Sequence, residues 1–362
     1  MAPRLPTRRD EAWRWADLRH AEAMRDVPAP ANDALPEVAR FRLAGGAPLL
    51  FLSGGQVVSG EAARPSPDRS APAHPLADFA AAVASAGLLL EVPVGSEGGT
   101  HEFLHLGTSG AAHSASRLIL DAGARLTLVE TLAGSGHDHW LNHRLDVELG
   151  EGAELTRLLL VPNGEGLVSE RLFARLGPAA RLTTVTLAAS AASVRTESHV
   201  ALAGTGASAQ VDGALLGHGA AAIDALTRLD HQLPGTASRQ TFRLVATDTA
   251  QVSIAGGIAV ARAAQQTDAE QSLKALVLKR TAAANLKPEL EILADDVRCA
   301  HGCAVGELDP AARFYLESRG LPRAEARALL TRAFLGAALE QLPEPLFAAV
   351  EGRVVEWLEG HA

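Results

Sequence analysis

The chain has 362 residues and a net charge of -9; 47% of its residues are hydrophobic, but only 4% are aromatic. That length and composition allow a large globular core, whereas the negative charge disfavours nucleic acid as a partner. No apolar run reaches the roughly 18 residues of a membrane span, and no apolar signal segment follows the basic N-terminus. We therefore expect a cytoplasmic protein that binds neither membranes nor nucleic acid.

The N-terminal region is expected to contain helices and an exposed linker. Thr7 and Asp10 resemble a capping box, and residues 11–24 contain neither Pro nor Gly, which predicts a first helix there. Prolines then recur, and the Pro- and Ser-rich stretch 63–75 is typical of a linker. A second helix is predicted over residues 77–90.

The middle of the chain contains an internal repeat. A small-residue turn such as Gly-Glu-Gly-Ala-Glu-Leu begins at residues 121, 150, 177 and 204, with short Leu- and Val-rich strands on either side. Turns with a period of about 28 residues can stack strand upon strand and bury a continuous core, as in a parallel β-helix. A doubly wound α/β sheet would need amphipathic helices in these short, Gly-rich gaps. We favour a right-handed form over a left-handed hexapeptide helix, because no six-residue apolar repeat is visible.

Three helices are predicted after the repeat. Asp309 and Pro310 suit the N-cap and first position of a helix that ends at Gly320, and further helices are expected over residues 321–342 and 346–358. The predicted fold is thus mainly β. A right-handed parallel β-helix core at residues 96–307 is flanked by an N-terminal helical region with linker at 1–95 and a C-terminal helical domain at 308–362.

Motifs of autonomous catalysis are missing from the sequence. None of the lysines, Lys274, Lys279 and Lys287, lies in a phosphate-binding loop, and neither a nucleophile elbow nor a zinc-protease motif occurs. We therefore expect a binding protein without an ATP site or a catalytic activity of its own.

Both cysteines lie in the segment 295–303, which reads Asp-Asp-Val-Arg-Cys-Ala-His-Gly-Cys. On an extended strand, Cys299, His301 and Cys303 would share one face with neighbours roughly 6 to 7 Å apart, so two of them could bind one metal. A zinc ion or an iron-sulfur cluster usually takes four ligands. The spacing therefore indicates either a site completed at an interface or no site, since a free cysteine is commonly a buried small residue.

A second concentration of metal-ligand residues consists of histidines only, and no cysteine lies near it. We expect surface or turn positions for these side chains rather than a metal site. They are His101, His105, His113, His137, His139 and His143.

The run from residue 268 to 320 closely resembles the SufD family and, more loosely, its SufB paralogues. The longest match is Ala-Asp-Asp-Val-Arg-Cys-Ala-His-Gly at 294–302, followed by Phe-Tyr-Leu-Glu-Ser-Arg-Gly at 314–320. Residues 11–18 and 236–239 are similar to further family segments. Cys303 departs from the alanine that the family usually has there, and we interpret it as an incidental substitution.

The resemblance implies a non-catalytic scaffold subunit of the SUF iron-sulfur cluster assembly complex. In that family, the β-helix pairs with a SufB homologue through its last strands, while the C-terminal helices dock a SufC ATPase. A transient iron-sulfur cluster is placed at the interface, where the family's ligands fall on His301 and Cys299, and the partner would supply the remaining ligands. A homodimer is left open.

From the residues alone, a carbohydrate-active β-helix enzyme of the lyase type is the alternative. Asp295 and Asp296 would be its candidate carboxylates, but adjacent strand residues face opposite ways and cannot act on one substrate from one face. The middle region also has few aromatic residues to line a sugar groove. Both points favour the scaffold.

Overall fold

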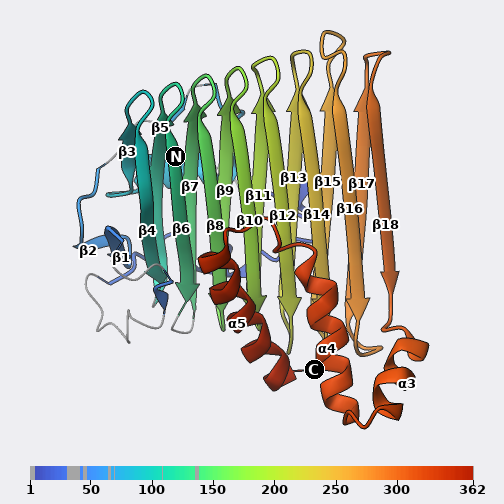
Figure 1. Cartoon of the computed structure of the whole chain (residues 1–362). Helices are drawn as coiled ribbons and strands as arrows, with labels where there is room; N and C mark the ends of the chain where they lie inside the picture. Colours follow the sequence, from blue (N-terminus) through green and yellow to red (C-terminus); the bar gives the residue numbers. More distant parts are fainter. Residues whose placement is uncertain are drawn as a thin grey trace.

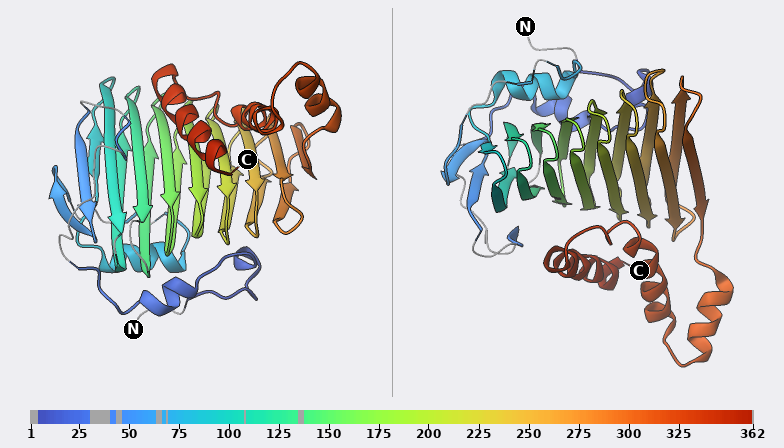
Figure 2. Two further views of the ribbon diagram at one scale, coloured as in Figure 1. Left: turned by 90° about the horizontal axis from the view of Figure 1, so that it is seen from below. Right: turned by 45° about the horizontal axis from the view of Figure 1, so that its top comes forward.

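Two parallel β-sheets face each other and form a β-helix, with helices at both ends of the chain (Figures 1 and 2). The computed structural model describes residues 5–30, 41–43, 47–63, 67–68, 70–107, 109–134 and 138–361. The even sheet has the strand order β18-β16-β14-β12-β10-β8-β6-β4-β1-β2, and the odd sheet has the order β17-β15-β13-β11-β9-β7-β5-β3. The chain thus passes alternately from one sheet to the other, as the repeat predicted.

From β4 to β18 the strands have 9 to 11 residues, and neighbours within each sheet pair in parallel. The exception among the described pairs is the antiparallel β1–β2 hairpin. The strands are β1 Leu49–Ser53, β2 Gln56–Ser59, β3 Leu89–Val92, β4 Glu97–Gly107, β5 Gly110–Leu120, β6 Arg125–Gly134, β7 His139–Leu149, β8 Glu154–Asn163, β9 Leu167–Leu176, β10 Arg181–Ser190, β11 Ser193–Leu202, β12 Ser208–Gly217, β13 Ala222–His231, β14 Ala237–Ala246, β15 Gln251–Val260, β16 Asp268–Val277, β17 Ala283–Ile292 and β18 Arg298–Gly306.

The repeated turns stack on one another where odd strands lead into even strands. The N–H of Gly123 donates to the carbonyl of Glu151 at 2.8 Å, and the N–H of Gly152 donates to the carbonyl of Pro178 at 2.8 Å. A Cβ added at Gly204 would lie 2.0 Å from backbone atoms of the preceding turn. The small residues are therefore required because successive backbones approach closely. This stacking confirms the predicted repeat.

Apolar side chains at one register position continue from coil to coil inside the β-helix. Leu155 pairs with Leu126 on one side and with Leu182 on the other, and all three are buried. Side chains alternate between the two faces of a strand, so every second residue of these strands enters the shared core. The parallel β-helix predicted from the repeat is confirmed.

The predicted N-terminal helix over residues 11–24 is wrong in its extent. The structure has a 3-10 helix, η1 Glu11–Trp13, and a separate short helix, α1 Arg19–Met24. The Asp10 carboxylate does accept the N–H of Thr7 at 2.8 Å. The break between the two helices lets Trp13 and Leu18 both pack into a cluster with Leu76 and Trp140.

The second predicted helix, over residues 77–90, is also shorter than expected. Helix α2 covers Pro75–Val83, and the chain then enters β3. Gly87 exchanges backbone hydrogen bonds with Ala63 at 2.8 and 2.9 Å, and an added Cβ at Gly87 would collide with the backbone of Ala115. Tertiary pairing therefore overrides the helical pattern there. Residues 64–66 and 69 of the predicted linker lie outside the described residues.

The C-terminal helices are α3 Pro310–Ser318, α4 Arg323–Gly336 and α5 Glu344–His361. The Asp309 side chain accepts the N–H of Ala311 at 2.8 Å, which confirms the predicted cap of α3. Helix α4 ends earlier than predicted, because residues 337–341 form turns. Helix α5 packs on the outer face of the even sheet (Figure 1), where Val350 and Val354 meet Leu158. Among the described helices, none is long and apolar enough to cross a membrane.

Candidate functional site

The candidate ligands lie on β18, the last strand of the even sheet. In the register with β16, Cys299 is next to Ala269, His301 next to Gln271, and Cys303 next to Leu273. These three β16 residues are buried inside the β-helix. Side chains at neighbouring register positions point to the same face of a sheet, so Cys299, His301 and Cys303 face the inner side of the final coil.

The final coil is open toward the end of the β-helix. In the described part of the chain, β18 pairs only with β16, and β17 pairs only with β15 (Figure 1). His301 and Cys303 are exposed, while Cys299 is half-buried. Three apolar residues near these strands, Ile292, Leu293 and Val305, are also exposed. The open end therefore combines strand edges without a neighbour among the described strands, apolar side chains, and Cys and His side chains.

Cys299 differs from Cys303 in its surroundings. It packs against a small apolar cluster that includes Val260 and Ala294. Burial raises the pKa of the Cys299 thiol, and the nearby Asp268 carboxylate adds to this rise. The thiol is therefore protonated at neutral pH, and a metal that binds it must displace the proton.

The described residues contain no group of three or more His, Cys, Asp or Glu side chains placed to hold a metal. Along a strand, Cys299 and Cys303 are roughly 13 Å apart, which is too far to share one ion. Cys299 and His301 are two residues apart on one face of β18, the same spacing that separates His301 from Cys303. They would make an incomplete site by themselves.

The histidines between residues 101 and 143 were expected at the surface or in turns, and this is wrong for His105, His139 and His143, which are buried. The Ser114 hydroxyl lies 2.9 Å from Nδ1 of His105 and 2.7 Å from Nδ1 of His143. Nε2 of His143 lies 3.2 Å from the Glu130 carboxylate. These side chains form a hydrogen-bond network inside the β-helix. His137 lies outside the described residues.

A row of polar side chains on the inner face of the even sheet was missed by sequence analysis. Arg157, Thr184, Gln240 and Gln271 are all buried, and they occupy one register row that ends at His301; Val211 interrupts it. Each has at least one buried polar atom without a hydrogen-bond partner among the described residues. The signal in the sequence is a polar residue at a position where the repeat otherwise has an apolar one.

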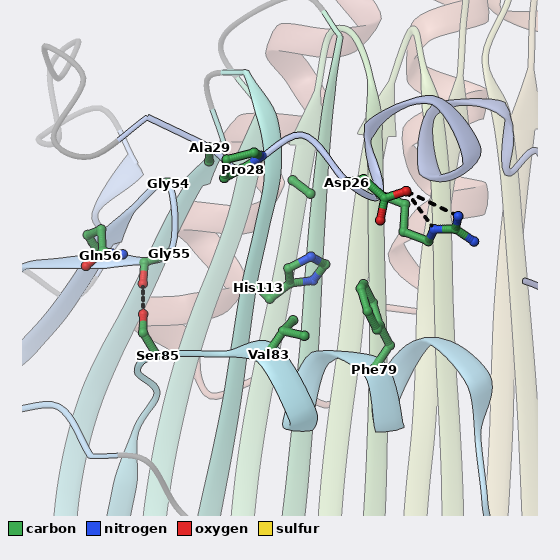
Figure 3. Close-up of a pocket in the computed structure, with 12 residues that line it drawn as sticks. Asp26, Pro28, Ala29, Gly54, Gly55, Gln56, Phe79, Val83, Ser85 and His113 are labelled. Carbon is green, nitrogen blue, oxygen red and sulfur yellow. Dashed lines mark hydrogen bonds and ion pairs between the residues drawn. The ribbon is translucent and has the colours of Figure 1, made fainter. Parts of the chain in front are cut away.

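A pocket of about 310 Å³ lies at the other end of the β-helix, between the β1–β2 turn, α2 and β5 (Figure 3). Its floor carries the His113 ring, which packs edge-on against Phe79 with ring centroids 5.0 Å apart. Burial lowers the pKa of His113 to about 4, so this imidazole is neutral at physiological pH. The pocket is separated from β18 by the length of the solenoid (Figure 1).

The C-terminal helices differ in how far they are buried. Helix α5 is anchored on the even sheet, whereas α3 has no buried residue and extends away from the β-helix (Figure 2). Its Phe314 and Tyr315 are 71% and 57% exposed. Exposed aromatic side chains on an amphipathic helix are typical of a protein-docking surface.

These features define a parallel β-helix protein whose last described strand carries Cys and His side chains at an open end. Residues 103–334 match the family model described as "SUF system FeS cluster assembly, SufBD core domain". The chain belongs to this family, and its homologues include proteins named SufD.

Three relatives illustrate the similarity. An iron-sulfur cluster assembly SufBD family protein of Synechocystis is 41% identical over 121 residues, which cover 33% of this chain and 26% of the relative. The iron-sulfur cluster assembly protein SufD of Escherichia coli is 36% identical over 140 residues, 38% of this chain and 33% of the relative. A SufBD family protein of Mycobacterium leprae is 30% identical over 184 residues, 47% of this chain and 46% of the relative. The matches thus span less than half of each relative.

Proposed function

We propose that this chain is a non-catalytic scaffold subunit that holds a nascent iron-sulfur cluster while it is built and released. The observation that carries the proposal is the placement of Cys299 and His301 on the inner face of a terminal strand that pairs, among the described strands, on one edge only, in a chain of the SufBD family. The cluster is the cargo of such a protein. We also propose a cytoplasmic location.

The partner at the open end would be a SufB-like homologue. Unpaired strand edges readily accept another strand, and monomeric proteins usually cover or charge them. The exposed Ile292, Leu293 and Val305 would be buried in the same contact. A second copy of this chain could pair through the same edges, and size-exclusion chromatography of the isolated protein distinguishes a homodimer from a monomer that awaits its partner.

The cluster would be bound by residues of both subunits. Cys299 and His301 supply soft ligands of the kind that iron-sulfur clusters take, but fewer than the usual four. A partner strand laid against β18 would bring the remaining ligands to the same place. Cys303 points to the same face, and we keep the interpretation that its thiol is incidental.

The SufC-like ATPase would dock on the C-terminal helices. This chain has no phosphate-binding loop, so ATP hydrolysis would come from the partner. Phe314 and Tyr315 on α3 are the exposed anchors that such a contact would use. The variant Phe314→Ala/Tyr315→Ala is expected to lose the ATPase from the complex and to keep the SufB-like subunit. Loss of both subunits would contradict the separation of the two surfaces.

Anaerobic co-expression with a SufB-like homologue and a SufC-like ATPase tests the proposal. The wild type is compared with His301→Ala, Cys299→Ala and Cys303→Ala for complex formation and for bound iron and sulfide. We expect every complex to assemble, with cluster content lost in the first two variants and kept in Cys303→Ala. If the wild type forms no complex, the scaffold proposal fails. Equal cluster content in all proteins keeps the scaffold and discards the ligand assignment.

A further inference from the structure

The amide of Gln271 on β16 is buried without a hydrogen-bond partner. Its side chain is only 1% exposed, and neither Nε2 nor Oε1 has a partner among the described residues. Buried amide groups in folded proteins are almost always hydrogen-bonded, so an unpaired one calls for an explanation. The explanation must lie in a group that reaches Gln271 in the working protein.

The odd sheet places a glycine opposite the amide of Gln271. Gly256 on β15 lies across the interior, and a Cβ added there would be 2.4 Å from Nε2 of Gln271. The amide nitrogen therefore faces a glycine, which has no side chain to bond. The register neighbour of Gly256 on β17 is Pro288, which has no N–H. The hydroxyl of Thr227, which also lies near Gly256, already donates to Gln240, so we look to the even sheet for a donor to Oε1 of Gln271.

The even sheet places one polar side chain on each side of Gln271. Gln240 precedes it in the register row, and Oε1 of Gln240 already accepts the hydroxyl of Thr227 at 2.6 Å. His301 follows it in the same row on β18. Neighbouring strands are roughly 4.8 Å apart, a distance that side chains on one face can bridge. A carbonyl oxygen accepts two hydrogen bonds, so Oε1 of Gln271 has room for donors from both sides.

We propose that Gln271 is a positioning residue for His301. Its Oε1 accepts the N–H of one imidazole nitrogen, which fixes the tautomer and turns the other nitrogen toward the open end. Metal-binding histidines generally donate their second ring N–H to an oxygen acceptor, which orients the ring and increases its basicity. The structure places His301 next to Gln271 in the register but shows no hydrogen bond between their side chains, so the contact itself is part of the proposal. This inference rests on the proposed function for the identity of the bound metal.

The tautomer of His301 tests the proposal in the isolated full-length chain. Histidine is labelled with nitrogen-15, the ring correlations are recorded by NMR, and His301 is assigned by its loss in His301→Ala. We expect one tautomer of His301 to dominate in the wild type and a mixture to appear in Gln271→Met, which keeps the side-chain length. Gln271→Glu retains an acceptor oxygen and is expected to restore the single tautomer.

Gln240→Met is the matched control, because Gln240 is equally buried in the same row and has an unpaired Nε2, but is one strand farther from His301. It is expected to leave the His301 tautomer unchanged. A mixture of His301 tautomers in the wild type would overturn the proposal. Equal effects of Gln240→Met and Gln271→Met on the tautomer would also overturn it.

Cluster loading separates this inference from the proposed function. In the anaerobic complex, Gln271→Met is expected to lower retained iron by roughly 10-fold, the lower range for loss of a residue that orients a metal ligand. If His301→Ala keeps its cluster, the ligand assignment fails while the tautomer result still decides the role of Gln271. If His301→Ala loses the cluster and Gln271→Met affects neither tautomer nor iron, the positioning role alone is wrong.

Discussion

Arg157 and Glu170 form an ion pair at 2.8 Å inside the β-helix, and both side chains are shielded from solvent. The same guanidinium donates to Glu130 at 2.5 Å, so one cation lies between two carboxylates from β6 and β9. Burial would raise the pKa of Glu130, but the charge of Arg157 and the hydrogen bond from His143 outweigh it and lower that pKa to about 2. Glu130 is therefore ionised, and Arg157 and His143 stabilise its buried negative charge.

The variant Arg157→Met should destabilise the protein strongly. Removal of one partner of a buried ion pair leaves an uncompensated charge and costs about 3–5 kcal/mol. The free energy of unfolding in urea measures the effect. Arg181→Met is the control, because its ion pair with Glu154 lies at the surface, and exposed pairs contribute less than about 1 kcal/mol. Similar losses in both variants would contradict a special role of the buried network.

The variant Asp212→Asn should stabilise the protein at neutral pH. Burial raises the pKa of Asp212 from 3.8 to about 7. Because the folded-state pKa lies above the unfolded-state value, the native state takes up a proton, and stability falls as pH rises from about 4 to about 7. Asparagine removes this dependence and can still accept the N–H of Thr241, which lies 2.8 Å from Oδ1. The melting temperatures of the wild type and of Asp212→Asn should therefore be similar near pH 4, and the variant should melt at a higher temperature by pH 7.

The control for this pH dependence is Asp230→Asn, for which the opposite sign is expected. The hydrogen bond and charge of His199 lower the pKa of Asp230 despite the desolvation that burial causes. Ionised Asp230 thus stabilises the native state above its unfolded-state pKa, and its removal should lower the melting temperature at neutral pH. A melting difference of the same sign for both variants would refute the assignment.

Gly204→Ala should disrupt the stacking of turns. The added methyl group would lie 2.0 Å from backbone atoms of Gly177 and Pro178, so the turns must separate. We expect a loss of about 1–3 kcal/mol, as for other overpacked sites, measured by urea unfolding. Gly352→Ala on α5 has no atom within 4 Å of the new Cβ. Alanine should stabilise that helix by about 0.5–1 kcal/mol. If Gly352→Ala destabilises the protein instead, the free space around the added Cβ does not predict the effect of the substitution.

Val305→Lys should block association at the open end without affecting the fold. Val305 is exposed on the edge strand β18, and a lysine on an edge strand discourages pairing with another strand. Co-purification with a SufB-like homologue is expected to be lost, with an unchanged melting temperature of the isolated chain. Val94→Lys, an exposed valine at the other end of the β-helix, should retain the partner. Undiminished co-purification of Val305→Lys would place the interface elsewhere.

The sequence predicted the β-helix well because small-residue turns recur at a nearly constant spacing. Gly123, Gly152 and Gly206 adopt positive φ angles of 67°, 63° and 71°, which glycine permits at low cost, and their spacing reports the coil length directly. The placement of Cys299 and His301 on one strand face also followed from residue alternation. Turn spacing and side-chain alternation can both be read from neighbouring residues in the sequence, without knowing which distant residues they contact.

The features that were missed depend on contacts between distant residues. Gln271 belongs to a polar row that becomes visible only when strands roughly 30 residues apart are placed side by side. His105 and His143 are buried because Ser114 and Glu130 satisfy them from other strands. Likewise, helix 11–24 is divided because two of its apolar residues pack on the β-helix. Propensity along the chain cannot anticipate such pairings.

The open last coil also bears on how the molecule loses its structure. In a solenoid each coil is stabilised mainly by its immediate neighbours, so a terminal coil with one neighbour opens more readily than the interior ones. The strands β17 and β18 form such a coil, with the candidate cluster ligands on its inner face. Their backbone amides should exchange with solvent faster than those of β10 or β12. A subunit that covers this coil would then act as its second neighbour, joining assembly of the complex to the local folding of the site.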